Sequence, residues 1–114
     1  MKSVFVELPA FARRRAEYLD DDRFRALQME MMATPEASDV IEGAGGLRKL
    51  RFADTRRGKG KRGGLRVIYY FWTAGAQFWL FAIYDKDEAS DLTASQRKAV
   101  KALLDAELRE RTQK

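Results

Sequence analysis

The feature that most constrains the fold is a pair of apolar, aromatic-rich runs separated by a short turn. Leu65–Thr73 and Phe78–Tyr84 consist mainly of β-branched and aromatic residues, and Thr-Ala-Gly-Ala at 73–76 lies between them. This composition is typical of strands, and the short separation predicts an antiparallel hairpin. Both faces of the first run are apolar, which indicates a central strand. The fold must therefore be built around a sheet that contains this hairpin.

The N-terminal third of the chain predicts one short strand and two helices. Val4–Val6 forms the strand, and Pro9 suits the first turn of an amphipathic helix, where its missing N–H costs nothing. The acids Asp20–Asp22 end this helix and are suited to cap the next, at Arg23–Met32. The short connection between the two predicts an αα-hairpin.

The remaining elements are a strand before the hairpin and one helix after it. Leu47–Ala53 is the predicted strand, Val40–Ile41 could be a further short one, and Thr93–Gln96 matches a capping box at the start of the last helix. The predicted apolar stripe of that helix is Val100, Leu103, Leu104 and Leu108. The order β-α-α-β-β-β-α predicts a single α+β domain over residues 1–114, with a small antiparallel sheet and the helices packed on one face.

Positive charge is concentrated in one stretch of the chain. The whole chain has 22 Lys and Arg against 17 Asp and Glu, a net charge of +5. Between Gly43 and Arg66 there are nine basic residues and one acid, together with seven of the eight glycines. That stretch carries +8, and the rest of the chain carries −3. Dense positive charge on a glycine-rich backbone indicates a polyanionic partner, either nucleic acid or a membrane surface.

The absence of Cys and His limits the chemistry of the chain. It excludes disulfides, thiolate zinc sites and cysteine nucleophiles, and also the residue that most often acts as general base or metal ligand. The acids at positions 85, 87, 88 and 91 lack the spacing of a calcium loop, and we interpret them as a turn and a helix approach. We therefore expect no metal and no cofactor.

The basic, glycine-rich residues 54–64 have three possible interpretations. The segment Gly58–Gly63 matches G-x-G-x-x-G, but a dinucleotide site needs a following helix, and here a strand follows. A solvated basic connection is the second interpretation. The third is a clamp for RNA or DNA, made of backbone N–H groups and cations. We favour the clamp because Lys49, Arg51 and Arg66 flank it on adjacent strands.

Aromatic residues of the hairpin are suited to stack on nucleic-acid bases, although strand alternation buries at least half of them. Tyr70 and Trp72 share a strand face with Arg66. We therefore predict these two as the stacking residues.

Several segments of the chain, taken in order, are similar to one toxin family. They are residues 1–7 (MKSVFVE), Ile41–Phe52 (IEGAGGLRKLRF), Gly58–Tyr70 (GKGKRGGLRVIYY), Ile83–Lys86 (IYDK) and Asp91–Thr93 (DLT). In sequence and spacing they resemble the HigB branch of the RelE/ParE toxin superfamily. The resemblance extends over almost the whole chain.

The resemblance implies the toxin of a type II toxin–antitoxin system. Toxins of this branch enter the ribosomal A site and cleave messenger RNA without a metal. A nucleotide 2′-OH attacks the adjacent phosphate and leaves a 2′,3′-cyclic phosphate. The implied partners are a cognate helix-turn-helix antitoxin, the ribosome and mRNA, with operator DNA contacted only through the antitoxin.

By position within these motifs, the resemblance assigns catalytic roles to Lys49, Arg51, Arg66 and Lys86. Arg51 and Arg66 can both hold the scissile phosphate, and our hypothesis is that Arg66 clamps it. Lys49 or Lys86 would transfer the proton, because a lysine crowded by other cations has a depressed pKa. The other predicted RNA contacts are Arg48, Arg56, Arg57, Lys59, Lys61, Arg62, Tyr70 and Trp72.

Two other functions stay open at this level. One is a ParE-type inhibitor of DNA gyrase, and the other is a noncatalytic basic module that binds RNA or DNA. The cationic cluster favours the nuclease, because a binding poison needs no convergent phosphate site. The most apolar run, Val67–Trp72, is too short to span a bilayer, and the N-terminus does not match a signal peptide. We therefore expect a cytoplasmic protein with no membrane partner.

Overall fold

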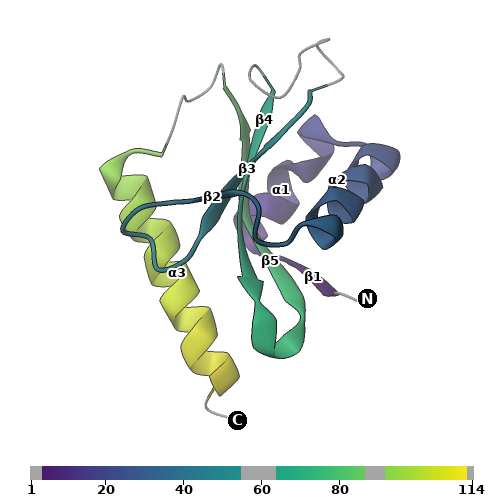
Figure 1. The fold of residues 1–114 in the computed structure, drawn as a ribbon. Helices are drawn as coiled ribbons and strands as arrows, with labels where there is room; N and C mark the ends of the chain where they lie inside the picture. Colours follow the sequence, from purple (N-terminus) through teal and green to yellow (C-terminus); the bar gives the residue numbers. More distant parts are fainter. Residues whose placement is uncertain (1–3, 55–63, 87–91, 113–114) are drawn as a thin grey trace.

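The computed structural model describes residues 4–54, 64–86 and 92–112 (Figure 1). In chain order the elements are β1 (Val4–Glu7), α1 (Pro9–Tyr18), α2 (Asp21–Ala33), β2 (Asp39–Val40), β3 (Arg48–Phe52), β4 (Leu65–Trp72), β5 (Gln77–Asp85) and α3 (Ala94–Thr112). The predicted α+β class is confirmed, but the predicted order β-α-α-β-β-β-α lacks one strand, because four strands, β2 to β5, lie between α2 and α3. The additional strand, β2, has only two residues, too few for side-chain alternation to reveal it. None of the described helices is long and apolar enough to cross a membrane.

The five strands form one mixed sheet in the order β1-β5-β4-β3-β2. The central strand is β4, as its two apolar faces predicted, and β3, β4 and β5 form an antiparallel meander. At the edge, however, β1 pairs with β5 in parallel, with Val4 opposite Gln77. The prediction of a purely antiparallel sheet was therefore wrong. The two edge partners are far apart in the chain, and side-chain alternation does not encode the direction of a neighbouring strand.

Helices cover both faces of the sheet, α1 and α2 on one side and α3 on the other (Figure 1). On the first face, Phe11 and Leu27 are fully buried in a cluster with Val67. On the second, Leu104 of α3 is fully buried in a cluster with Trp79. The prediction that the helices gather on one face was wrong. The central strands are apolar on both faces, so both faces must be removed from water.

The N-termini of α2 and α3 are capped as predicted. The Asp20 side chain accepts a hydrogen bond from the Arg23 backbone N–H at 2.8 Å. Before α3, the Gln96 N–H donates to Thr93 Oγ1 at 3.1 Å, and the Thr93 N–H donates to Gln96 Oε1 at 2.9 Å. These bonds satisfy N–H groups that have no partner within the helix.

The apolar stripe of α3 is narrower than predicted. Leu104 is fully buried, and Val100 and Leu108 pack against the same cluster. Leu103, by contrast, is 51% exposed, so its predicted burial was wrong. The side chain next to a buried helical position is rotated away by about 100°, and only a helix covered on two sides would bury both.

A shift of register in β5 decides which of its side chains share a face. The pairing of β4 with β5 shifts between Ile68 and Tyr69, which leaves Phe81 as an extra residue. Strict alternation would place Trp79 and Tyr84 on opposite faces of the sheet. Because of the extra residue, both belong to the cluster beneath α3.

A buried tyrosine ties β4 to the loop after α2, and we predict its effect on stability. Tyr69 is fully buried, and its hydroxyl donates to the Pro35 carbonyl at 2.8 Å. Burial raises the pKa of Tyr69 above its usual value of 10.0, so the folded protein keeps the phenol neutral. The unfolded chain ionises first as the pH rises past 10, and the tyrosine's contribution to stability is then lost.

Tyr69→Phe should accordingly lower the free energy of unfolding by about 1 kcal/mol at pH 7, the net value of one hydrogen bond. The difference from wild type should shrink above pH 10. Denaturant unfolding at pH 7 and at pH 10.5 measures both effects. An unchanged difference at the two pH values would contradict the assigned pKa shift.

Candidate functional site

A row of paired residues crosses the sheet on the face that α3 covers. Arg51 of β3 lies directly opposite Arg66 of β4, and Arg66 lies opposite Tyr84 of β5. Directly opposite residues present their side chains on the same face, and Tyr84 belongs to the cluster beneath α3. Like charges in this position destabilise a sheet. The direct pairing of Arg51 with Arg66 is a local conflict of the kind that concentrates at functional sites.

Arg66 is held in place by the backbone at the start of β4. Its side chain is almost entirely buried, with 4% exposure, and Nη1 donates to the carbonyls of Gly64 at 3.5 Å and Leu65 at 3.3 Å. Arg51 is exposed beside Arg66. The arginine pair therefore offers one fixed, buried guanidinium and one accessible guanidinium, an arrangement suited to a phosphate.

The two predicted lysines lie on either side of the arginine pair. Lys49 is two residues before Arg51 on β3, and therefore on the same face, and it is half-buried opposite Asp39 of β2. Lys86 is exposed just after β5, and its backbone N–H donates to the Gly64 carbonyl at 3.2 Å. The structure thus gathers three of the predicted cations at one end of the sheet, with Lys49 one step further along β3.

Two cavities adjoin this face at the β2–β3 edge. One, of about 240 Å³, extends from Lys49 to Arg97 of α3. The other, of about 340 Å³, extends from Lys49 past Arg51 toward the end of α2. Both are lined by Asp39 and Lys49, so the two hollows meet beside the cationic residues.

Arg48 lies on the opposite face of the sheet from the arginine pair. It pairs with Tyr69, and its Nη1 donates to the carbonyls of Glu36 at 2.8 Å and Ser38 at 2.7 Å. These bonds stabilise the connection between α2 and β2. Arg48, a predicted RNA contact, is therefore separated by the sheet from the other predicted cations.

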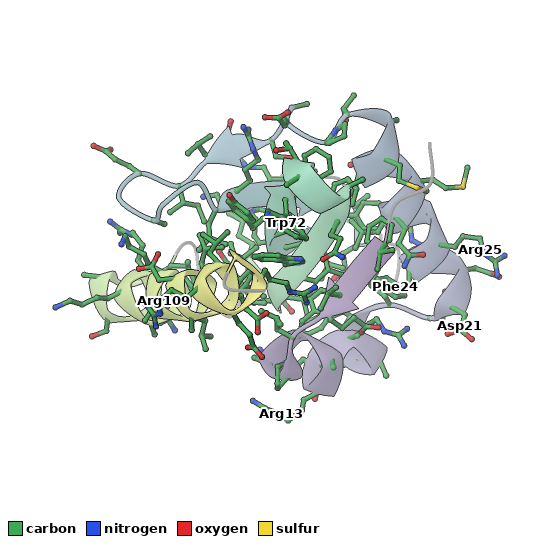
Figure 2. All side chains as sticks on the ribbon, turned by 90° about the horizontal axis from the view of Figure 1, so that it is seen from below. Arg13, Asp21, Phe24, Arg25, Trp72 and Arg109 are labelled. Atoms are coloured by element: carbon green, nitrogen blue, oxygen red, sulfur yellow. The ribbon has the colours of Figure 1, made fainter. Side chains whose placement is uncertain are left out.

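Tyr70 and Trp72 share the face of Arg66, as predicted, but lie further along β4. Four and six residues of strand separate them from Arg66, roughly 13 and 20 Å. Each ring lies 5.4 Å from the ring of Trp79, and Figure 2 shows Trp72 in the centre of the molecule, next to α3. The structure does not bring these two rings to the arginine pair. The five loop residues predicted to bind RNA, Arg56, Arg57, Lys59, Lys61 and Arg62, lie outside the described residues.

Two residues join the site through strand pairing and were not predicted. Tyr84 lies opposite Arg66 and is 7% exposed. Its position two residues before Lys86 could have identified it, because side chains two apart on a strand share a face. Asp39 lies opposite Lys49, but a two-residue strand carries too short a pattern to show its pairing. Within residues 4–54, 64–86 and 92–112, no group of three or more acids is placed to hold a metal ion.

Comparison with known proteins identifies a similar fold in solved toxin structures. No protein-family model matches the chain. A double arginine-to-alanine mutant of the E. coli toxin RelE in the free state aligns over 79% of this chain and 90% of the toxin, with a TM-score of 0.56 and 10% sequence identity. The isolated E. coli RelE toxin aligns over 88% of this chain and 97% of the toxin, with a TM-score of 0.51 and 13% identity. This chain therefore has the α+β fold of the RelE toxin, with three helices and a five-stranded mixed sheet.

Proposed function

We propose that this protein is the toxin of a type II toxin–antitoxin system, of the HigB type, and that it cleaves messenger RNA on the ribosome without a metal ion. The observation that carries the proposal is the direct pairing of Arg51 with Arg66 on neighbouring strands. Like charges directly opposite each other on neighbouring strands are unfavourable, and an anion bound near both would offset their repulsion. The RelE-like fold supports the same conclusion.

The proposed reaction is an internal phosphoryl transfer in RNA. The 2′-oxygen forms a bond to the adjacent phosphorus as the bond to the 5′-oxygen breaks, leaving a 2′,3′-cyclic phosphate and a 5′-hydroxyl. Arg51 and Arg66 bind the phosphate oxygens, whose negative charge increases in the transition state. One of Lys49 and Lys86 accepts the proton of the 2′-hydroxyl, and a lysine of this pair in its ammonium form gives a proton to the departing 5′-oxygen.

The burial of Arg66 gives the two arginines different parts in this reaction. Arg51 is exposed and meets the phosphate first, whereas Arg66 is already oriented by the carbonyls of Gly64 and Leu65. A charge fixed before the reaction needs no reorganisation as the transition state forms. Arg66 therefore contributes chiefly to the transition state, and Arg51 to both binding and catalysis.

The proposal also names partners and a cellular location. The protein acts in the cytoplasm, in the ribosomal A site, and the basic residues at 56–62 bind ribosomal RNA. A cognate helix-turn-helix antitoxin neutralises it, and the pair contacts operator DNA through the antitoxin.

Mapping of RNA 5′ ends after induction of the chain tests this function. We expect new ends inside translated messages, and their loss when the start codon of a reporter message is removed. Messages cut equally with and without translation would contradict ribosome dependence. Intact messages accompanied by double-strand DNA breaks would overturn the proposal in favour of gyrase inhibition, and intact RNA and DNA would leave only a binding module.

A further inference from the structure

The cavity between the β2–β3 edge and α3 has the composition of a binding site for a polar, planar ligand. It has a volume of about 240 Å³ and is lined by Asp39, Val40, Ile41, Glu42, Lys49 and Arg97. Two carboxylates and two cations thus meet around two aliphatic side chains. The groups come from β2, the segment after it, β3 and α3, so they converge only in the folded protein.

Three of the four charged groups in this cavity are available to a ligand. Among the described residues, the side chains of Asp39, Glu42 and Arg97 form no hydrogen bond or ion pair. Asp39 and Glu42 are exposed, and Arg97 is half-buried. The cavity therefore offers hydrogen-bond acceptors and donors together, and no described protein group uses them.

The cavity lies next to the proposed phosphate site. Lys49 is two residues from Arg51 on the same face of β3, a distance of roughly 6.6 Å along the strand. The second cavity is lined by both Lys49 and Arg51, so it connects the two places. A nucleotide with its phosphate on the arginine pair would extend its base along β3, past Lys49, to reach Asp39 opposite that lysine.

The two carboxylates are informative because the substrate of the proposed function is a polyanion. An acid beside RNA is repelled by the phosphates unless it accepts hydrogen bonds from the N–H groups of a base. Guanine offers two such donors, N1–H and the N2 amino group, next to the acceptor O6. Adenine and cytosine each offer one amino group beside a ring acceptor, and uracil offers a single N3–H between two carbonyl oxygens. A carboxylate matches both guanine donors, and Lys49 or Arg97 matches O6 or N7.

We propose that this cavity is the base-recognition pocket of the site and that it selects guanine next to the scissile phosphate. Asp39 or Glu42 accepts from N1–H and N2–H, and Lys49 or Arg97 donates to the acceptor edge. Val40 and Ile41 contact the face of the ring. The position of the pocket beside a scissile phosphate rests on the proposed ribonuclease function.

Binding of mononucleotides to the full-length chain tests the pocket directly. By calorimetric titration we expect guanosine 3′-monophosphate to bind at least fivefold more tightly than uridine 3′-monophosphate, from the discrimination typical of a bidentate base contact. The double variant Asp39→Asn, Glu42→Gln should lose this difference, because each amide replaces one acceptor oxygen with a donor. Equal affinities of wild type for the two nucleotides, or an unchanged difference in the double variant, would overturn the pocket.

Cleavage mapping on reporter messages with each of the four bases beside the cut site provides the second measurement. Wild type should favour guanine, and the double variant should cut the four messages at similar rates. The matched control is Asp22→Asn on α2, whose side chain is 94% exposed on the other side of the sheet, and it should keep the preference.

The two hypotheses fail in different ways. Cleavage by wild type with no base preference contradicts the pocket and leaves the ribonuclease in place. Selective binding of the guanine nucleotide without any RNA cleavage contradicts the ribonuclease and leaves the pocket in place.

Discussion

Replacing Arg51 with glutamine is expected to lower RNA cleavage about 100-fold and to leave the fold intact. The substitution removes a charged donor to the scissile phosphate, and the loss of one such donor typically costs two to three orders of magnitude in rate. Arg51 is also exposed and directly opposite Arg66, so its removal relieves a repulsion. The melting temperature should therefore stay the same or rise slightly. Initial cleavage rates and thermal unfolding followed by circular dichroism measure the two effects.

Arg25→Gln is the matched control for lost positive charge. Arg25 lies on α2 with a side chain 73% exposed, and it points away from the sheet (Figure 2). Its replacement should change the cleavage rate less than twofold. Wild-type cleavage by Arg51→Gln would remove Arg51 from the phosphate site, and a large loss of stability would contradict the repulsion between Arg51 and Arg66.

The partner of Arg51 needs a different pair of variants because it is buried. Arg66→Gln should lose cleavage by at least the same factor, with folding checked by circular dichroism. Arg66→Lys keeps the charge but loses the two-pronged geometry of the guanidinium, so its cleavage rate should fall between wild type and Arg66→Gln. If Arg66→Ala inhibited growth as strongly as wild type, Arg66 would not be part of the phosphate site.

Leu104→Ala is expected to lower the free energy of unfolding by about 2–5 kcal/mol, the usual cost of truncating a fully buried leucine. Leu104 has no exposed surface and joins α3 to the cluster around Trp79. The neighbouring Leu103→Ala is the control, because that side chain is 51% exposed and its loss should cost within about 0.5 kcal/mol. Alanine and leucine have similar helix propensity, so the difference reports burial.

Urea unfolding of the two leucine variants measures this difference. Similar losses of stability in both would mean that α3 does not rest on the sheet through Leu104. The same experiment tests whether α3 packs on the face of the sheet that carries the arginine pair. The sequence predicted helices on one face only.

Much of the candidate site was visible in the sequence because it depends on composition and on short-range alternation. Lys49 and Arg51 share a strand face at two-residue spacing, and the structure keeps them there. The same alternation places Arg48 on the opposite face, which the prediction of Arg48 as an RNA contact overlooked. Tyr70 and Trp72 show where alternation fails as a guide to a site. They share the face of Arg66, but they lie too far along β4 to meet it.

By itself, the sequence determined the three helices, every strand except β2, the caps of α2 and α3 and the central position of β4. These depend on neighbouring residues, whose apolar spacing and capping groups act over one or two turns or a single strand. Only the tertiary structure decided the rest: the parallel edge formed by β1, the second helical layer formed by α3, the register that pairs Arg51 with Arg66, and the bulge that places Trp79 and Tyr84 on one face. The physical reason is that pairing direction, register and layer order are chosen by burial of both apolar faces at once, through contacts between residues far apart in the chain.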